Sequence, residues 1–328
     1  MPRKDSNEIY AGVDLGGTSM IAAVVTAKGR ILASREASTE AVKGDWAAAV
    51  DQIADTIQKA CRKARVRPAT LSGVGVGAAG AVDIVKGVVV SAPNLGWSDA
   101  PVTRALSRKL GVDVHLDNDV HVALIGEHAL GAARGAKNAV AIWVGTGIGG
   151  GILVDGRLHY GSRGSAGEIG HMVIQVDGPI CGCGRRGCAE SLSSRTAMER
   201  DVRALSEAGQ RSAALRIMDE IGKTRMTSSV IQKAIDETDP IVLQVLARAQ
   251  KAIGVLVSNL VNVLDPELVV IGGGIAERLG DLFVGPIRQF AYEGFIRQSD
   301  RETVRIVTST LGDRAGALGA AFMARDRS

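Results

Sequence analysis

Residues Ala166 to Glu190, AGEIGHMVIQVDGPICGCGRRGCAE, contain three of the four cysteines of the chain and a histidine shortly before them. Cys181, Cys183 and Cys188 are interleaved with glycines, and His171 lies upstream of the first cysteine. Thiolate and imidazole are the ligands that zinc prefers, and glycines let a short loop fold around the ion. We predict a structural zinc site, because these four side chains would fill every tetrahedral position.

Disulfide bonding is the alternative interpretation of this cluster. It is typical of secreted proteins, but no apolar signal segment precedes the first apolar run, and Cys61 is the sole further cysteine. Cys61 lies on the apolar face of a helix expected over Asp45 to Ala64, where it is a small core residue. Glu168 and Glu190 flank the cluster, so the loop ordered by the metal would present carboxylates to a ligand.

Composition favours an α/β protein. The chain has 328 residues, enough for two domains with a large core. Hydrophobic residues make up 46% and aromatic residues only 3%, with 41 glycines, so Ala, Val, Ile and Leu must build the core. The 39 basic and 35 acidic residues are spread along the chain, which argues against a nucleic-acid-binding patch. No apolar run reaches the length of a membrane span, and we expect a cytoplasmic protein.

A glycine turn joins the first two expected strands, Ile9 to Asp14 and Ser19 to Thr26. The turn contains Gly16, Gly17 and Thr18. Its backbone N–H groups and the Thr18 hydroxyl could hold a phosphate, and Asp14 could orient Mg²⁺ through water. An ordinary tight hairpin is the alternative, because turns favour glycine for conformational reasons alone.

A second glycine run, Gly145-Thr146-Gly147-Ile148-Gly149-Gly150-Gly151, follows an expected strand over Ala139 to Val144. It matches the dinucleotide-binding pattern, but another strand follows it, so no helix N-terminus would receive a pyrophosphate. A second phosphate-binding hairpin fits better. Two such hairpins indicate a duplicated fold that holds a nucleotide between its halves.

A third glycine run, Gly272-Gly273-Gly274, closes an expected strand over Leu268 to Ile271. It forms a bend where the backbone could approach a flat ligand such as adenine.

Polar residues follow two further strands. Asn118 and Asp119 come after an expected strand over Val112 to Leu116 and begin a helix that reaches Leu130. Asp119 is either a helix cap or a general base aimed at a hydroxyl, since open α/β sheets bind ligands at the carboxyl ends of their strands. Asn94 lies in a Pro/Gly loop, where it is either a turn residue or a hydrogen-bonding group for a polar ligand.

Hydrophobic periodicity supplies the remaining elements. Further strands are expected at Val74 to Ala78, Gly87 to Ser91 and Val304 to Val307, and a third strand starts at Ile31. Further helices are expected at Thr196 to Ala208, Ala213 to Gly222, Thr227 to Asp236, Pro240 to Leu264, Leu279 to Tyr292 and Gly316 to Ala324. We place the domain boundary near residue 120, with residues 1–120 and the terminal helix 315–328 in a smaller domain and residues 121–314 in a larger one.

These motifs, taken in order, resemble the ROK family of sugar kinases and sugar-responsive repressors, and most of all its bacterial ATP-dependent glucokinases. The resemblance covers nearly all of residues 9–325. It rests on Asp14-Leu15-Gly16-Gly17-Thr18, Asn118-Asp119, the Gly145 to Gly151 run, Gly167-Glu168-Ile169-Gly170-His171, Cys181-x-Cys183-x4-Cys188-Ala-Glu190, and Asp265-Pro266-Glu267 through Gly274.

The resemblance implies an actin-like (ribonuclease H-like) ATPase fold with a duplicated core and two domains around a cleft. It implies that Asp119 is the catalytic base, taking the proton of the glucose 6-hydroxyl during its attack on the γ-phosphorus of ATP bound with Mg²⁺. Residues implied to bind the sugar are Asn94, Asn118, Asp119, Glu168, His171 and Glu190. Residues implied to bind the nucleotide are Asp14, Gly16, Gly17, Thr18, Gly145, Thr146, Gly147, Gly272, Gly273 and Gly274. Zinc would hold the sugar loop through His171, Cys181, Cys183 and Cys188.

Two departures from the family pattern bear on sugar preference. His121 replaces the second asparagine of an Asn-Asp-Ala-Asn motif, and Ala79 replaces a proline. Kinases for N-acetylglucosamine, N-acetylmannosamine, fructose or allose therefore remain alternatives. A sugar-sensing regulator is less favoured, because the first strand begins too early for a preceding DNA-binding domain, and a dehydrogenase ranks last. The family also implies a homodimer or homotetramer.

Overall fold

The computed structural model of the chain describes residues 8–328. The chain divides into two compact units: unit 1 contains residues up to Gly135 together with Tyr160–Ala166 and Asp313–Ser328, and unit 2 contains Ala136–His159 and Gly167–Gly312. The boundary expected near residue 120 thus falls at Gly135. The reason is that the helix after residue 118, α3 (Asp119–Leu130), packs on the C-terminal helix α11 (Ala315–Arg327) and stays in unit 1.

Unit 1 is built around one five-stranded sheet. Its strands lie in the order β3-β2-β1-β4-β8, with β2 antiparallel to both β1 and β3, and with β1, β4 and β8 mutually parallel. The strands are β1 (Ile9–Leu15), β2 (Ser19–Thr26), β3 (Ile31–Ser38), β4 (Gly73–Ala78) and β8 (Val114–Asn118). A smaller sheet follows β4 and contains β5 (Ala81–Asp83), β6 (Val88–Ala92) and β7 (Trp97–Ala100).

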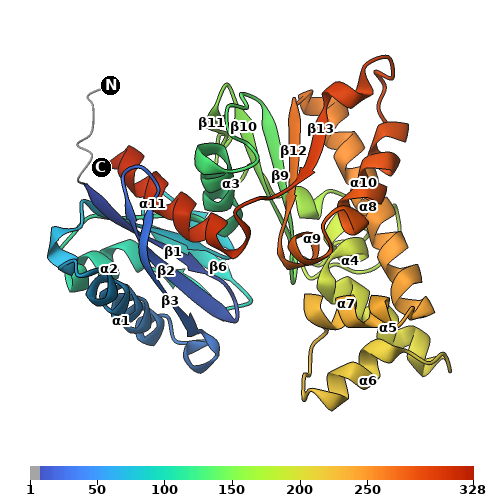
Figure 1. Ribbon diagram of the computed structural model, residues 1–328, viewed down its shortest axis with the longest axis horizontal. Helices are drawn as coiled ribbons and strands as arrows, with labels where there is room; N and C mark the ends of the chain where they lie inside the picture. The colour runs from blue at the N-terminus through green and yellow to red at the C-terminus, as the bar shows by residue number, and fades with distance from the viewer. Residues whose placement is uncertain (1–7) are drawn as a thin grey trace. The chain divides into compact units, whose positions relative to one another are not determined.

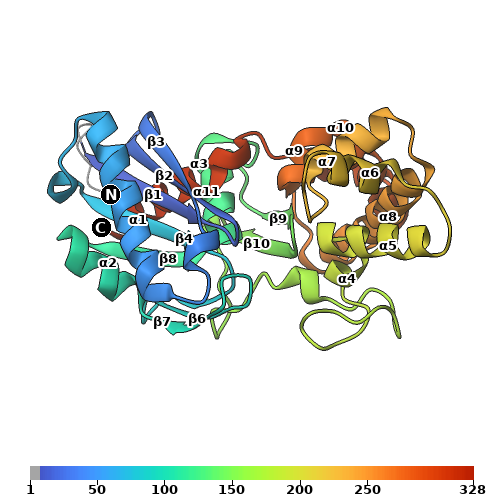
Figure 2. The ribbon, with the colours of Figure 1, turned by 90° about the horizontal axis from the view of Figure 1, so that it is seen from below.

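Helices cover both faces of the unit 1 sheet, as Figures 1 and 2 show. One face carries α1 (Trp46–Ala64) and α2 (Val102–Leu110), and the other carries α3 (Asp119–Leu130) and α11 (Ala315–Arg327). The α3–α11 contact is very close, since a Cβ added to Gly319 would lie 1.6 Å from the Val122 carbonyl oxygen. Cys61 is fully buried on the inner face of α1, as its place on the apolar face predicted.

Unit 2 repeats the same sheet. Its strands lie in the order β11-β10-β9-β12-β13, again with two antiparallel pairings on one side of the first strand and two parallel pairings on the other. The strands are β9 (Ala139–Val144), β10 (Ile148–Val154), β11 (Arg157–Leu158), β12 (Leu268–Gly272) and β13 (Arg305–Thr308). This repetition is the duplicated core of the actin-like ATPase fold, which confirms the predicted fold class.

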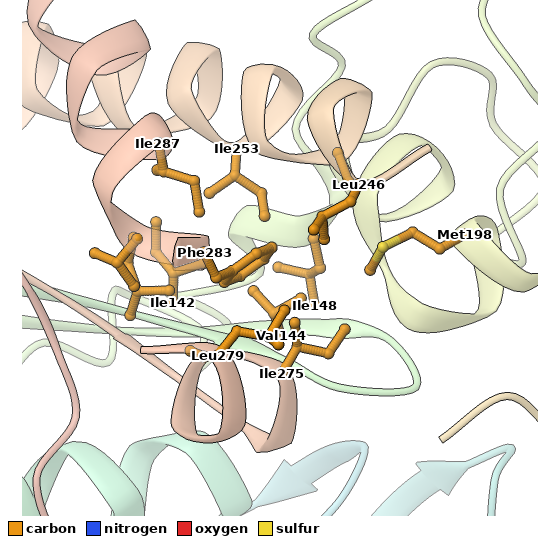
Figure 3. Close-up of a cluster of buried hydrophobic side chains, with 14 of the residues drawn as sticks. Ile142, Val144, Ile148, Met198, Leu246, Ile253, Ile275, Leu279, Phe283 and Ile287 are labelled. Carbon is orange, nitrogen blue, oxygen red and sulfur yellow. The ribbon is translucent and has the colours of Figure 1, made fainter. Parts of the chain in front are cut away.

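The helices of unit 2 enclose an aliphatic core. They are α4 (Ala189–Ser193), α5 (Arg195–Glu207), α6 (Ala213–Glu220), α7 (Ser228–Asp236), α8 (Pro240–Leu264), α9 (Gly274–Leu279) and α10 (Asp281–Glu293). Figure 3 shows Phe283 of α10 among isoleucines of the sheet and of α8, and Phe283 is fully buried. Each such side chain contributes about 1.5–3 kcal/mol on burial. The core is therefore aliphatic, as the low aromatic content predicted.

Helix α8 is long and apolar enough by composition to cross a membrane, with a mean hydropathy of 1.4 over its most apolar window. The expectation that no apolar run reaches that length was therefore wrong. However, 61% of that window is buried inside unit 2. Its apolar residues pack on the sheet and on α10, so α8 is the central core helix of this unit.

Candidate active site and metal centre

In unit 1 the candidate catalytic residues lie at one edge of the sheet. Strands β1, β4 and β8 are parallel, and their register aligns Asp14 with Gly77 and Gly77 with Asp117. Their carboxyl ends therefore meet at the same edge, which is where open α/β sheets bind ligands. Asn118 and Asp119 follow directly at that edge.

The first glycine turn is closed by a hydrogen bond of 2.9 Å from the Gly16 N–H to the Ser19 carbonyl. The Asp14 side chain lies against Gly316 at the start of α11, and Asn94 packs directly beside Gly17. Predicted ligand residues from two separate stretches thus meet in unit 1, where Asn94 contacts Gly17 of the turn that follows Asp14. Thr18 is exposed at the tip of the turn.

Asn118, rather than Asp119, caps helix α3. Its Oδ1 accepts hydrogen bonds from the N–H groups of Val120 (2.8 Å) and His121 (3.3 Å), and its Nδ2 donates to the Gly80 carbonyl (3.1 Å). The cap alternative for Asp119 is therefore unnecessary, since Asn118 already performs that role. The amide of Asn118 is largely engaged by the backbone, and its direct contact with a sugar stays a prediction.

Asp119 is the first residue of α3 and is partly buried. Its Oδ1 accepts a hydrogen bond of 3.0 Å from the Val120 N–H. Burial raises the pKa of the Asp119 carboxyl above its usual value, and this outweighs the opposing effect of that hydrogen bond. A carboxylate with a raised pKa is a stronger base, which suits proton abstraction from a hydroxyl.

A buried network of charged side chains lies next to the carboxyl edge of the unit 1 sheet. Asp117, with no exposed surface, binds His121 Nδ1 (2.9 Å), Tyr160 Oη (2.7 Å) and Arg327 Nη2 (2.8 Å). Burial alone would raise the pKa of Asp117, but these partners, His121 foremost, hold it below its usual value. The other ring nitrogen of His121 faces the Ala166 carbonyl at 3.2 Å. His121, the departure from the family motif, thus helps to fix the strand end before Asp119.

In unit 2 the four predicted zinc ligands come together. The ligand atoms of His171, Cys181, Cys183 and Cys188 all lie within 4.8 Å of one another. The distance is 3.6 Å from His171 Nδ1 to Cys181 Sγ and 3.7 Å between the Sγ atoms of Cys183 and Cys188. A tetrahedral ion with bonds of about 2.0 Å to nitrogen and 2.3 Å to sulfur requires edges of about 3.6 and 3.8 Å. The cluster therefore fits a tetrahedral metal ion.

The thiols of this cluster differ in their acidity. Burial raises the pKa of Cys181 to about 12, whereas the Arg185 N–H, which hydrogen-bonds to Cys183, lowers the pKa of that exposed thiol to about 6. Cys183 is thus the thiol most readily ionised in the protein without metal. Binding a cation would displace the remaining protons.

Glu190 connects the metal cluster to the second glycine turn. Its Oε1 lies 3.5 Å from Cys181 Sγ, and its Oε2 accepts a hydrogen bond of 2.9 Å from the Ile148 N–H. Glu168 is exposed just before the 3₁₀ turn that contains His171 (Ile169–His171). Because Nδ1 of His171 faces the cysteines, its Nε2 is left for a ligand. The predicted metal site and the Glu190 carboxylate therefore adjoin one another in unit 2, and Glu168 lies three residues before His171 in the sequence.

If Glu190 binds the sugar, as the family resemblance implies, Gly147→Ala should raise the KM for that sugar about 10-fold, the usual scale for losing one hydrogen bond to a charged group, here the bond from the Ile148 N–H to Glu190. A Cβ at Gly147 would lie 2.3 Å from Oε2 of Glu190, so the carboxylate must move. Gly182→Ala is the matched control, because a Cβ there meets nothing within 4 Å. Steady-state kinetics with varied sugar would show the difference, and equal KM values for the two variants would contradict it.

The second glycine turn is shorter than the sequence suggested. Gly145, Thr146 and Gly147 form the turn, whereas the later glycines of the run lie within β10. The element after the turn is a strand, as expected, so the dinucleotide-binding interpretation has no helix to support it. The turn is bound instead by the start of α5, since the Arg195 N–H donates to the Gly145 carbonyl (2.9 Å).

The third glycine run forms a turn from β12 into helix α9 rather than a simple bend. Gly273 adopts φ +90, and a Cβ there would meet the Val144 carbonyl at 2.5 Å. Gly272 and Gly273 are buried, whereas Gly274 keeps some exposure and lies beside Ser228 at the start of α7. Of the three predicted nucleotide residues in this run, Gly274 is the one open to a ligand.

Comparisons with known proteins show which family the chain belongs to. A glucokinase from Halalkalibacterium halodurans is 35% identical over 325 residues, which cover 98% of this chain and 96% of that protein. A xylose repressor from Caldicellulosiruptor bescii is 33% identical over 82% of this chain and 66% of its own length. The crystal structure of a ROK family glucokinase from Streptomyces griseus, in complex with glucose and AMPPNP, has a TM-score of 0.84 at 31% identity and covers 97% of this chain and 99% of that one. The ROK family model matches residues 10–327, and the chain belongs to the ROK family.

Proposed function

We propose that this chain is an ATP-dependent glucokinase of the cytoplasm that phosphorylates the 6-hydroxyl of glucose. The observation that carries the proposal is the placement of Asp119. It lies at the carboxyl edge of the unit 1 sheet, on the same edge as the phosphate-type turn that follows Asp14, and burial raises its pKa. The similarity to glucokinases over nearly the full chain supports the choice of reaction.

In this mechanism the Asp119 carboxylate accepts the proton of the glucose 6-hydroxyl. The sugar oxygen then forms a bond to the γ-phosphorus while the bond from that phosphorus to the β–γ bridging oxygen breaks, releasing ADP. Little covalent work falls to the protein, because alignment of the two oxygens and stabilisation of charge supply most of the rate. Mg²⁺ bound with ATP would neutralise charge on the phosphates, with Asp14 orienting it through water.

The metal cluster would serve the sugar site indirectly. We assign zinc to it, because three thiolates and one imidazole in tetrahedral spacing are its preferred set. With Nδ1 on the metal, His171 can offer Nε2 to a sugar hydroxyl, next to the carboxylates of Glu168 and Glu190. A structural ion would thereby fix the orientation of a sugar-binding ring. Asn94 in unit 1 would bind a further hydroxyl.

The test is a substrate panel with purified, zinc-loaded enzyme. Glucose, mannose, fructose, allose, N-acetylglucosamine and N-acetylmannosamine are each offered with ATP, GTP or polyphosphate, and the phosphorylated position is read by NMR. The proposal expects the highest kcat/KM for glucose with ATP and phosphate on O6. A higher kcat/KM for an N-acetylhexosamine would overturn the glucose assignment. Sugar binding without transfer from any donor would show that the chain is a sugar-binding regulator.

A further inference from the structure

Arg195 donates two hydrogen bonds to the second glycine turn, although it is not part of any of the three glycine runs. Its N–H donates to the Gly145 carbonyl at 2.9 Å, and its Nη2 donates to the Thr146 Oγ1 at 2.8 Å. The next residue adds a third link, because Thr196 Oγ1 donates to the Thr146 carbonyl at 2.8 Å. The guanidinium is therefore held directly beside the turn that we assign to the nucleotide.

The charge of Arg195 is not balanced within unit 2. Among residues 8–328 no carboxylate lies within ion-pair distance of its guanidinium, although the side chain is partly buried. The carboxylate of Glu199 acts on the Arg195 guanidinium through its charge, without an ion pair. That carboxylate already binds other groups: Oε1 binds Arg203, and Oε2 binds Arg225 and the Met226 N–H. A partly desolvated cation without a partner is costly, so this arrangement favours an anion.

A second cation strengthens this argument. Arg225 reaches the same place from the other side, since its Nη2 donates to Thr196 Oγ1 at 3.2 Å. Burial, and then the positive charge of Arg225, lower the pKa of the Arg195 guanidinium. Two cations thus converge on Thr146 and Thr196, and the carboxylate that pairs with Arg225 is shared with Arg203. The first turn of α5 adds a partial positive charge of its own.

We propose that Arg195 binds the phosphate chain of the phosphoryl donor at the Gly145–Gly147 turn. This inference rests on the proposed function, and it adds a residue and a chemical class to the donor site. A guanidinium matches phosphate because its planar N–H groups can form two parallel hydrogen bonds to oxygen atoms. One N–H is used by Thr146, which leaves the others for the ligand. The chemistry recognised is a chain of linked phosphates, whether or not a nucleoside is attached.

The experiment compares Arg195→Ala and Arg195→Lys with the wild-type holoenzyme. Binding of ATP, ADP, AMP and inorganic tripolyphosphate is measured by calorimetry, and the KM values for ATP and for glucose are measured separately. We expect Arg195→Ala to weaken ATP binding and raise its KM about 10- to 100-fold, the range for losing charge-assisted hydrogen bonds. The KM for glucose should stay within about twofold of the wild-type value, because glucose carries no phosphate with which Arg195 could form charge-assisted hydrogen bonds. Arg195→Lys should recover part of the affinity for ATP, because lysine keeps the positive charge but lacks the planar N–H groups that bind two oxygen atoms at once.

Arg216→Ala is the matched control, because it removes a surface arginine of unit 2 that is paired with Glu220 and Glu237. It should bind ATP as the wild type does. The loss caused by Arg195→Ala should be large for ATP and small for AMP, and loss for tripolyphosphate as well would show that the phosphate chain alone is recognised. If Arg195→Ala weakens ATP binding but the wild type does not bind tripolyphosphate, a nucleoside must accompany the phosphates. That result would still support a contact between Arg195 and the phosphates.

Three results would overturn the inference: unchanged ATP affinity in Arg195→Ala, an equal loss for AMP and ATP, or an equal rise in both KM values. The failure of the proposed function is distinguishable, because it would appear as absent phosphoryl transfer in the wild type. The calorimetric comparison needs no turnover. Absence of any ATP binding by the wild type would overturn both.

Discussion

Replacing Asp119 with Asn is expected to lower kcat about 10²- to 10⁴-fold, the scale of losing a general base. The amide cannot accept the proton of the sugar hydroxyl, but it can still accept the hydrogen bond that Asp119 takes from the Val120 N–H. Sugar binding should therefore change little. Product formation in a coupled ADP-release assay, together with a sugar-binding isotherm, measures the two effects separately. Near-normal turnover in this variant would refute the assignment.

Stability provides the control for this variant. The folded-state pKa of Asp119 is raised, so its stabilising contribution is complete below the unfolded-state pKa and is lost as the pH rises through the folded-state pKa. Ionisation of the Asp119 carboxyl group therefore destabilises the folded state, and Asp119→Asn, which carries no charge, should not lower Tm. A large fall in Tm would mean that lost activity reflects unfolding. For the same reason, the acidic limb of the wild-type kcat profile should lie above the usual titration range of an aspartate.

Cys183→Ser is expected to lower zinc affinity at least about 10²-fold and to raise the KM for the sugar about 10-fold. Cys183 is exposed, so losing the thiol removes a metal ligand without opening a cavity in the core. The loop that carries His171 and Glu190 would then lose the ion that we propose orders it. Metal content measured by mass spectrometry, followed by kinetics with varied sugar, tests both steps.

Cys61→Ala is the control for that variant, because Cys61 is buried in unit 1 and belongs to a different cluster. It should keep full metal content and an unchanged KM for the sugar. Removing zinc from the wild type with a chelator should reproduce the Cys183→Ser phenotype, and adding zinc back should restore the wild type alone. Full zinc retention by Cys183→Ser would contradict the four-ligand site.

The sequence predicted best those elements whose cause is local. Long apolar runs became strands close to their expected bounds, as at Ser19–Thr26 and Ala139–Val144, and the capped periodic pattern at Pro240–Leu264 became a helix. The grouping of His171, Cys181, Cys183 and Cys188 in space could also be predicted, because ligand type and spacing are properties of the residues themselves.

Other features depend on neighbours far along the chain and escaped prediction. The short strands β5 and β7 are stabilised by pairing with β6, and Trp97–Ala100 has too little apolar character to indicate a strand alone. Glycines in β10 were assigned to a loop because glycine disfavours strands. The helix expected at Leu279 to Tyr292 corresponds to α10, whereas the short helix α9 before it was not predicted, and Gly280, at φ +54, separates the two. The place of Arg195 beside the second glycine turn could not be predicted from the sequence, because its partner Thr146 lies 49 residues away.

The C-terminal helix gives this protein an unusual order of assembly during translation. Helix α11 packs against β1 and β4, and Arg327 binds the buried Asp117 of β8. All three strands leave the ribosome long before α11 does. Until α11 is synthesised, the face of the sheet that it covers remains exposed. Unit 1 contains the earliest strands but is therefore the last to finish folding, whereas the last residue of unit 2 is Gly312. Nascent chains stalled before α11 should accordingly protect unit 2 from protease and leave unit 1 open to cleavage.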